Sequence, residues 1–140
     1  CKDTVQCLLD GGANTSLHDN VGATPLIAAC MRRHHKMVDL LLNGGALVNL
    51  LTVLHRTALM EACHSNAVKC VKLLMEYDLE VNQADVKGYT ALHESARDNH
   101  IRCVRLLISY GASGCVCAHR HVCVGDVMRL LDRRLIVTVL

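Results

Sequence analysis

The segment CVCAHRHVC, from Cys115 to Cys123, carries a potential metal ligand at every second position. Cysteine thiolates and histidine imidazoles are common zinc ligands. In a strand, however, residues two apart lie about 6.6 Å from each other, whereas two sulfurs on one zinc ion are at most about 4.6 Å apart. In a helix, the same side chains point about 200° apart. The spacing therefore disfavours a zinc site, and we predict no metal ligands in the chain.

Two other short patterns resemble catalytic or metal-binding motifs. HESAR at 93–97 begins like the zinc motif H-E-x-x-H, but Arg97 replaces the second histidine, so the pair of zinc ligands is incomplete. Cys63 and His64 are adjacent, which places their side chains about 100° apart on a helix and makes a poor nucleophile–base pair. We expect the helical carboxylates on a solvated face: Glu61, Glu94 and Asp98. The sequence thus predicts no enzyme activity, no catalytic residue, no cofactor and no small-molecule substrate.

The sequence repeats with a period of 33 residues, and this repeat determines where any site residue lies. ATPLIAAC at 23–30 recurs as RTALMEAC at 56–63 and as YTALHESA at 89–96. Several columns keep the same period, namely Thr24, Thr57 and Thr90; Val5, Val38, Val71 and Val104; and Leu8, Leu41, Leu74 and Leu107. Chance does not hold independent columns in register over four units, so the chain is predicted to be a repeat protein.

Each unit contains the pattern of two short helices. Leu26, Ala29 and Cys30 form the apolar face of the first helix, and KMVDLLLN at 36–43 has the spacing of a second. Thr24 is placed to cap the first helix, with Pro25 at the first helical position. Glycines close the units, and the joins between helices are expected to need a left-handed residue: Arg33, Asn66 and Asn99.

The pattern D-x-x-G-x-T-P-L-H, followed by two helices and G-A-x-V-N, resembles the ankyrin repeat. The first complete unit matches it at Asp19, Gly22, Thr24, Pro25, Leu26, Gly45, Ala46, Val48 and Asn49. The resemblance covers about residues 2–113 and implies an all-α fold, an α-solenoid of helix-turn-helix units with β-hairpin fingers. The predicted divisions are a truncated repeat at 1–18, repeats at 19–51, 52–84 and 85–113, and a non-consensus Cys/His tail at 114–140. We interpret the tail as ending in a capping helix.

Composition narrows the functional classes. The formal charge of +2 favours neither nucleic acid nor an acidic membrane, and no apolar run approaches the ~18 residues of a membrane helix. A column of basic residues, Lys36, Lys69 and Arg102, predicts a basic stripe on the second helices. Aromatic residues for base stacking are missing around it, which disfavours nucleic acid. Five cysteines have helix-core spacing, so we expect an intracellular protein, cytoplasmic or nuclear: Cys7, Cys30, Cys63, Cys70 and Cys103.

The resemblance implies an unidentified partner protein bound on the concave side of the solenoid. By repeat register, the partner-binding residues are predicted to be Met31, Arg32, Val53, Leu54, Arg56, His64, Lys87, Tyr89, Arg97 and Asp98. The finger at 46–56 is unusually apolar, and its leucines either contact a partner or pack on adjacent fingers. We therefore predict a protein–protein interaction module, an adaptor or scaffold fragment. The alternatives are a substrate-recognition subunit of a ubiquitin ligase, a zinc-binding tail and nucleic-acid binding.

Overall fold

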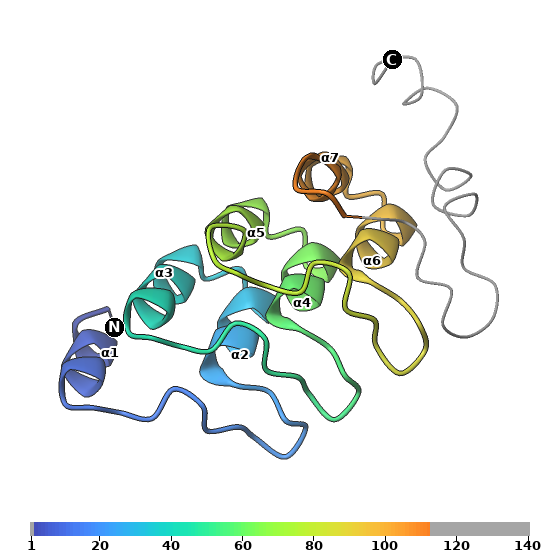
Figure 1. Cartoon of the computed structure of the whole chain (residues 1–140). Helices are drawn as coiled ribbons and strands as arrows, with labels where there is room; N and C mark the ends of the chain where they lie inside the picture. The colour runs from blue at the N-terminus through green and yellow to red at the C-terminus, as the bar shows by residue number, and fades with distance from the viewer. Residues whose placement is uncertain (1, 113–140) are drawn as a thin grey trace.

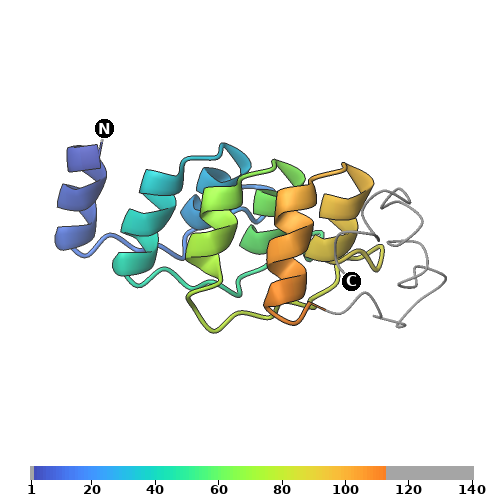
Figure 2. The same cartoon turned by 90° about the horizontal axis from the view of Figure 1, so that it is seen from above.

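Two layers of short antiparallel helices form the described part of the computed structural model, residues 2–112 (Figures 1 and 2). One layer contains α1 (Lys2–Asp10), α3 (His35–Asn43), α5 (Val68–Leu74) and α7 (Ile101–Ser109). The other layer contains α2 (Pro25–Met31), α4 (Ala58–His64) and α6 (Ala91–Arg97). From α2 onward, each helix packs on its partner in the unit and on the equivalent helix of a neighbouring unit, and α1 packs on α3. The predicted all-α solenoid is confirmed.

Threonine begins each helix of the α2, α4 and α6 layer. Thr24 Oγ1 accepts the Ile27 N–H at 3.3 Å, and Thr57 Oγ1 accepts the Met60 N–H at 3.1 Å. The third unit adds a reciprocal bond, because the N–H of Thr90 donates to Nδ1 of His93 at 3.2 Å. Side-chain oxygens thus satisfy N–H groups that the first helical turn leaves without partners.

The joins between paired helices use the left-handed conformation, as the sequence predicts. Arg33, Asn66 and Asn99 have φ values of 60°, 54° and 58°. Asparagine tolerates this region better than arginine does, so the strain of the first join falls on Arg33. The three equivalent turns place the start of α3, α5 and α7 along one edge of the molecule (Figure 2).

The core is aliphatic and sulfur-rich. Cys30, Cys63, Cys70 and Cys103 are buried free thiols between the layers, at the positions where the sequence predicts small apolar side chains. A side-chain hydrogen bond with Cys70, together with burial, raises the pKa of the Cys30 thiol far above its ordinary value. The prediction for Cys7 is wrong, because α1 has a neighbouring unit on one side only and leaves this thiol exposed.

The fingers are the loops 19–23, 52–56 and 85–89, which project below the helices in Figure 1. We expected β-hairpins, but residues 2–112 contain no assigned strand, because each finger is only long enough for one tight turn. In the first finger, the Asp19 N–H donates to the Ala23 carbonyl at 3.1 Å. Neighbouring fingers are joined by backbone bonds, Val53 N–H to the Val21 carbonyl and Val86 N–H to the Leu54 carbonyl, both 3.1 Å.

The predicted tail at 114–140 lies outside the described residues, together with its Cys/His segment and the capping helix that we expect there. The predicted repeat boundaries stay an interpretation of the sequence. None of the helices within residues 2–112 combines the length and the apolar character that a membrane crossing needs.

Candidate functional site

A groove of about 430 Å³ lies between the fingers and the α2, α4 and α6 layer. We call it the concave groove, and its lining consists of Met31, Leu54, Arg56, Glu61, His64, Asp85, Val86, Lys87, Tyr89, Glu94 and Arg97. Seven of the ten residues that the sequence places at a partner site line it: Met31, Leu54, Arg56, His64, Lys87, Tyr89 and Arg97. The structure thus gathers positions that are up to 66 residues apart, which is two repeat periods.

The other three predicted site residues do not line the concave groove. Arg32 is exposed at the end of α2, and Val53 is exposed on the middle finger. Asp98 is not among the lining residues, but its Oδ2 is 2.9 Å from Nδ1 of His64 and its Oδ1 accepts from Nε of Arg97 at 3.2 Å. Asp98 therefore helps to orient two lining residues.

Arg56 holds the floor of the concave groove together. Its Nε donates to Glu61, and one terminal nitrogen lies 3.2 Å from Glu94 Oε1 and 3.5 Å from Asp85 Oδ2. One guanidinium from a finger thus bridges carboxylates from α4, from the next finger and from α6. Burial alone lowers the pKa of Arg56, but the bonds to Glu61 and Glu94 outweigh it and raise that pKa above its ordinary value.

Arg97 adds further ion pairs to those of Arg56, at a more exposed position. Its terminal nitrogen donates to Glu94 Oε2 at 2.7 Å. The hydrogen bond with Asp98 raises the pKa of Arg97, and the same bond lowers the pKa of the Asp98 carboxyl. Nδ1 of His64 lies 3.4 Å from Glu94, so this one carboxylate contacts side chains from its own repeat and from the preceding one. The side chains are therefore fixed before any partner arrives.

The expectation that the helical carboxylates face solvent is wrong for two of them. The side chains of Glu61 and Glu94 are 10% and 2% exposed. The reason is that the fingers fold back over the first helices and bring Arg56 and Asp85 onto them. A buried carboxylate is tolerable only when its charge is paired and hydrogen-bonded, and the two arginines supply both.

His64, Glu94 and Asp98 form a cluster with the residue types of a metal site. One ligand atom from each lies within 4.8 Å of the other two. The arginines already occupy this cluster, since Arg97 bonds both carboxylates and Arg56 bonds Glu94. A divalent ion would have to displace these guanidiniums, so the geometry fits an ion-pair network better than a metal centre.

The other motifs with potential chemistry are separated by their surroundings. His93 is buried and bonded to Thr90, while Arg97, at the place of the second zinc ligand, pairs with Glu94. Cys63 is fully buried, whereas the side chain of the neighbouring His64 is half exposed. The buried thiol and the exposed imidazole therefore lie in different environments.

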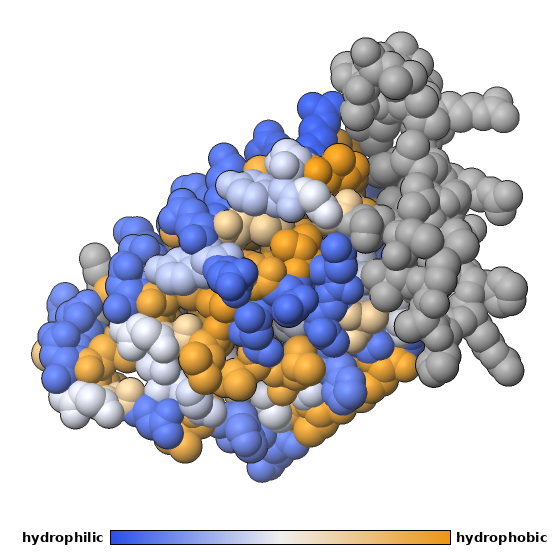
Figure 3. Space-filling view, viewed as in Figure 1, coloured by the Kyte–Doolittle hydropathy of each residue, from blue (hydrophilic) through white to orange (hydrophobic). Residues whose placement is uncertain are grey.

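The rim of the concave groove is apolar. Met31, Leu54 and Val86 are 51%, 53% and 55% exposed, and hydrophobic surface is visible along the finger side in Figure 3. The ring of Tyr89 packs edge-on against His93, with centroids 6.1 Å apart. The backbone bonds between fingers do not cover these tips, so the fingers pack through their main chains and leave the side chains available.

Comparison with known families and proteins places the chain. The family of ankyrin repeats, described as three copies, matches residues 1–85 and 48–116. A search of curated proteins gives no significant match. The repeat period, the threonine caps, the two-layer stack and this match agree, and the chain belongs to the ankyrin repeat family.

Proposed function

We propose that this chain is a non-enzymatic adaptor or scaffold module that binds a partner protein through the concave groove and the adjacent finger tips. The observation that carries the proposal is an exposed apolar rim above a floor of side chains already fixed by ion pairs. Ankyrin repeats are in general protein-binding modules. The free buried cysteines suit a reducing compartment, so we propose the cytoplasm or nucleus as its location.

The floor of the concave groove is suited to binding because it is preorganised. Arg56 and Arg97 are each held by two or more carboxylates, so little side-chain freedom remains to be lost on association. Tyr89 is partly fixed by its contact with His93, and it is the one Phe, Tyr or Trp residue among the lining residues that the structure describes. Aromatic and arginine side chains dominate many protein interfaces, and we expect Tyr89 and Arg97 to contribute most.

The charges of the groove lining balance. Its carboxylates are those of Glu61, Asp85 and Glu94, and its permanent cations are Arg56, Lys87 and Arg97. A balanced lining gives little net attraction to a charged ligand. The expected partner segment therefore presents apolar side chains to Met31, Leu54 and Val86 and uses hydrogen bonds toward the floor.

The test compares two pairs of exposed apolar residues. Met31→Ser with Leu54→Ser removes the apolar rim, and Leu17→Ser with Leu47→Ser removes leucines that are 66% and 58% exposed outside the groove lining. Each chain is immobilised at equal amounts, and the proteins retained from a cell lysate are quantified by mass spectrometry. We expect a set of proteins that the wild type and the control pair retain and the rim pair loses.

Tyr89→Ala and Arg97→Ala should each weaken binding of the same proteins by about tenfold or more, since truncating an interface anchor commonly costs 2 kcal/mol or more. Retention of identical proteins by the rim pair and the control pair would show that the concave groove is not the binding surface. The ubiquitin-ligase alternative depends on residues 114–140, which lie outside the described residues.

A further inference from the structure

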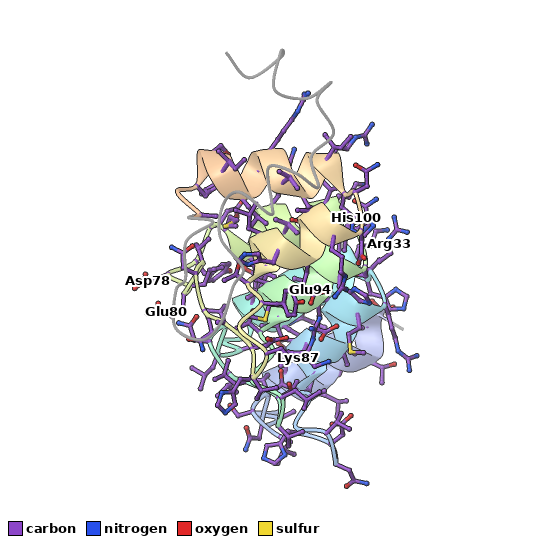
Figure 4. The ribbon with its side chains drawn as sticks, turned by 90° about the vertical axis from the view of Figure 1, so that its right-hand side faces the viewer. Arg33, Asp78, Glu80, Lys87, Glu94 and His100 are labelled. Carbon is purple, nitrogen blue, oxygen red and sulfur yellow. The ribbon has the colours of Figure 1, made fainter. Side chains whose placement is uncertain are left out.

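A second groove, of about 620 Å³, lies at the edge where the paired helices join. We call it the basic groove, and it is lined by residues of three successive joins: Arg33, His35, Asn66, Ala67, Val68, Lys69, Cys70, Lys72, Asn99, His100, Ile101 and Arg102. Figure 4 shows Arg33 and His100 on this edge, with Asp78 and Glu80 on the opposite edge of the molecule. The surface is thus separate from the concave groove and has only basic side chains among its charged lining residues.

Among residues 2–112, the four permanent cations of the basic groove are not paired with a carboxylate. Arg33, Lys69, Lys72 and Arg102 are exposed, and no carboxylate belongs to the lining. Within residues 2–112, none of these four side chains makes an ion pair or a hydrogen bond, whereas Arg56 and Arg97 are fully engaged in the concave groove. Like charges gathered in one hollow repel one another, and an anion relieves that repulsion.

The polar groups between the cations are positioned by the fold. His100 Nδ1 lies 2.7 Å from the Cys63 carbonyl, so that nitrogen donates inward and fixes the ring. The Asn66 side-chain oxygen accepts the Cys103 thiol at 3.6 Å, which leaves the amide N–H groups as donors for a ligand. Asn66 and Asn99 are held in place by the left-handed joins. The groove therefore combines polar groups that the fold positions with four exposed cations.

We propose that the basic groove binds a phosphorylated segment of a partner protein. A phosphate group carries close to two negative charges and three acceptor oxygens, and arginine and lysine clusters are its usual protein ligands. Arg33 and Arg102 can each present a planar pair of donors to such a group, and Lys69 and Lys72 add point charges. This site is independent of the concave groove and needs no residue of it.

The same surface fits nucleic acid and lipid less well. Proteins that bind single strands typically stack bases on aromatic side chains, and the lining residues within 2–112 include no Phe, Tyr or Trp; Tyr89 lies in the concave groove. Membrane binding needs apolar side chains that insert beside the cations, and none of the exposed large hydrophobic residues belongs to this lining. A hollow of this size instead suits a side chain that projects from a polypeptide.

The test uses a fluorescein-labelled ten-residue peptide of glycine and serine with two adjacent phosphoserines, and its unphosphorylated twin, in fluorescence anisotropy with the full chain. The groove variant is Lys69→Gln with Arg102→Gln. The matched control is Lys36→Gln with Arg105→Gln, which removes two exposed cations from α3 and α7 outside the lining. We expect the phosphopeptide alone to bind, and the groove variant to lose at least about tenfold in affinity while the control changes less than about threefold.

Two comparisons decide the class of ligand. A thymidine oligonucleotide and vesicles of phosphatidylcholine with phosphatidylserine are titrated under the same conditions, with melting curves showing that every variant is folded. Equal losses in both variants, no difference between the peptide twins, or tighter binding of the oligonucleotide or vesicles through Lys69 and Arg102 would each overturn the proposal.

Discussion

The concave groove and the basic groove are both lined by charged side chains but differ in how those charges are paired. In the concave groove, arginines and carboxylates from different repeats neutralise one another, and Glu94 is 2% exposed. In the basic groove, four cations remain solvated and unpaired within the described residues. Charge on one solenoid face therefore contributes to folding, while charge on the other is exposed to solvent.

The largest expected difference between the two grooves is in the stability lost when one cation is removed from each. Arg56→Ala leaves three neighbouring carboxylates without their shared partner, and we expect a loss of about 3–5 kcal/mol in the free energy of unfolding. Lys69→Ala removes an exposed unpaired charge, and we expect a change within about 0.5 kcal/mol. Urea unfolding of both variants measures the contrast, and similar costs for the two would refute it.

Alanine substitutions at two glycines test whether the close contact between neighbouring fingers contributes to stability. A Cβ on Gly22 would lie 2.9 Å from the backbone nitrogen of Val53, whereas a Cβ on Gly12 would meet nothing within 4 Å. Both glycines have positive φ, at 77° and 79°. Gly12→Ala reports backbone strain alone, about 1 kcal/mol, and Gly22→Ala should cost about 1 kcal/mol more. Thermal melts of the two variants would show whether the contact between fingers matters, and equal costs would mean that it does not.

The middle finger offers a stabilising substitution. His55 has a φ of 58° at the column where the flanking fingers have Gly22 and Gly88. His55→Gly should raise the free energy of unfolding by about 0.5–1 kcal/mol, because the relief of left-handed strain exceeds the added chain entropy. The free energy of unfolding of His55→Asn should lie between those of the wild type and His55→Gly. Chemical denaturation checks the order, and a destabilised glycine variant would mean that the His55 side chain has a contact worth more than the strain.

The smallest expected effect concerns pH. The bond with Arg97 lowers the pKa of Asp98 below its ordinary value, so this carboxylate adds stability above about pH 4 and loses it as pH falls through the folded-state pKa. Asp98→Asn should therefore narrow the difference in urea midpoint between pH 6 and pH 3. The Lys69→Gln variant should keep the wild-type pH dependence, which makes it the control. If Asp98→Asn keeps the wild-type pH dependence of the urea midpoint, the ion pair of Asp98 does not contribute to stability.

Sequence reasoning succeeds where the determinants are local. The caps at Thr24, Thr57 and Thr90, and the left-handed joins, depend on residues within four positions of one another, so the 33-residue period is enough to predict them. The same period assigns finger and helix positions to one concave side, which is why most predicted partner residues line one groove.

The ion pairs in the floor of the concave groove cannot be predicted from the pattern of a single repeat, because they depend on contacts between repeats. Arg56 and Glu94 are 38 residues apart, and nothing in either local pattern shows that a finger returns over the next helix. A signal existed in the columns: Arg56 replaces the Ala23 and Tyr89 of its neighbours, and Glu61 and Glu94 share a column in which the first unit has Ala28. An arginine that appears in only one repeat, together with two carboxylates that share a column, is the pattern of a buried ion pair. For this reason the predicted partner site does not include the floor residues Glu61, Asp85 and Glu94.

The fingers are tied to one another by main-chain bonds, from Val53 to Val21 and from Val86 to Leu54. The side chains at these tips are exposed and contribute little to holding the loops in place. Shape and specificity are therefore encoded by different atoms: the backbone sets the spacing of the tips, and the side chains are free to vary. In a directed-evolution library, positions 21, 53, 54 and 86 can be randomised together, and selection for a new target then acts on an almost constant scaffold.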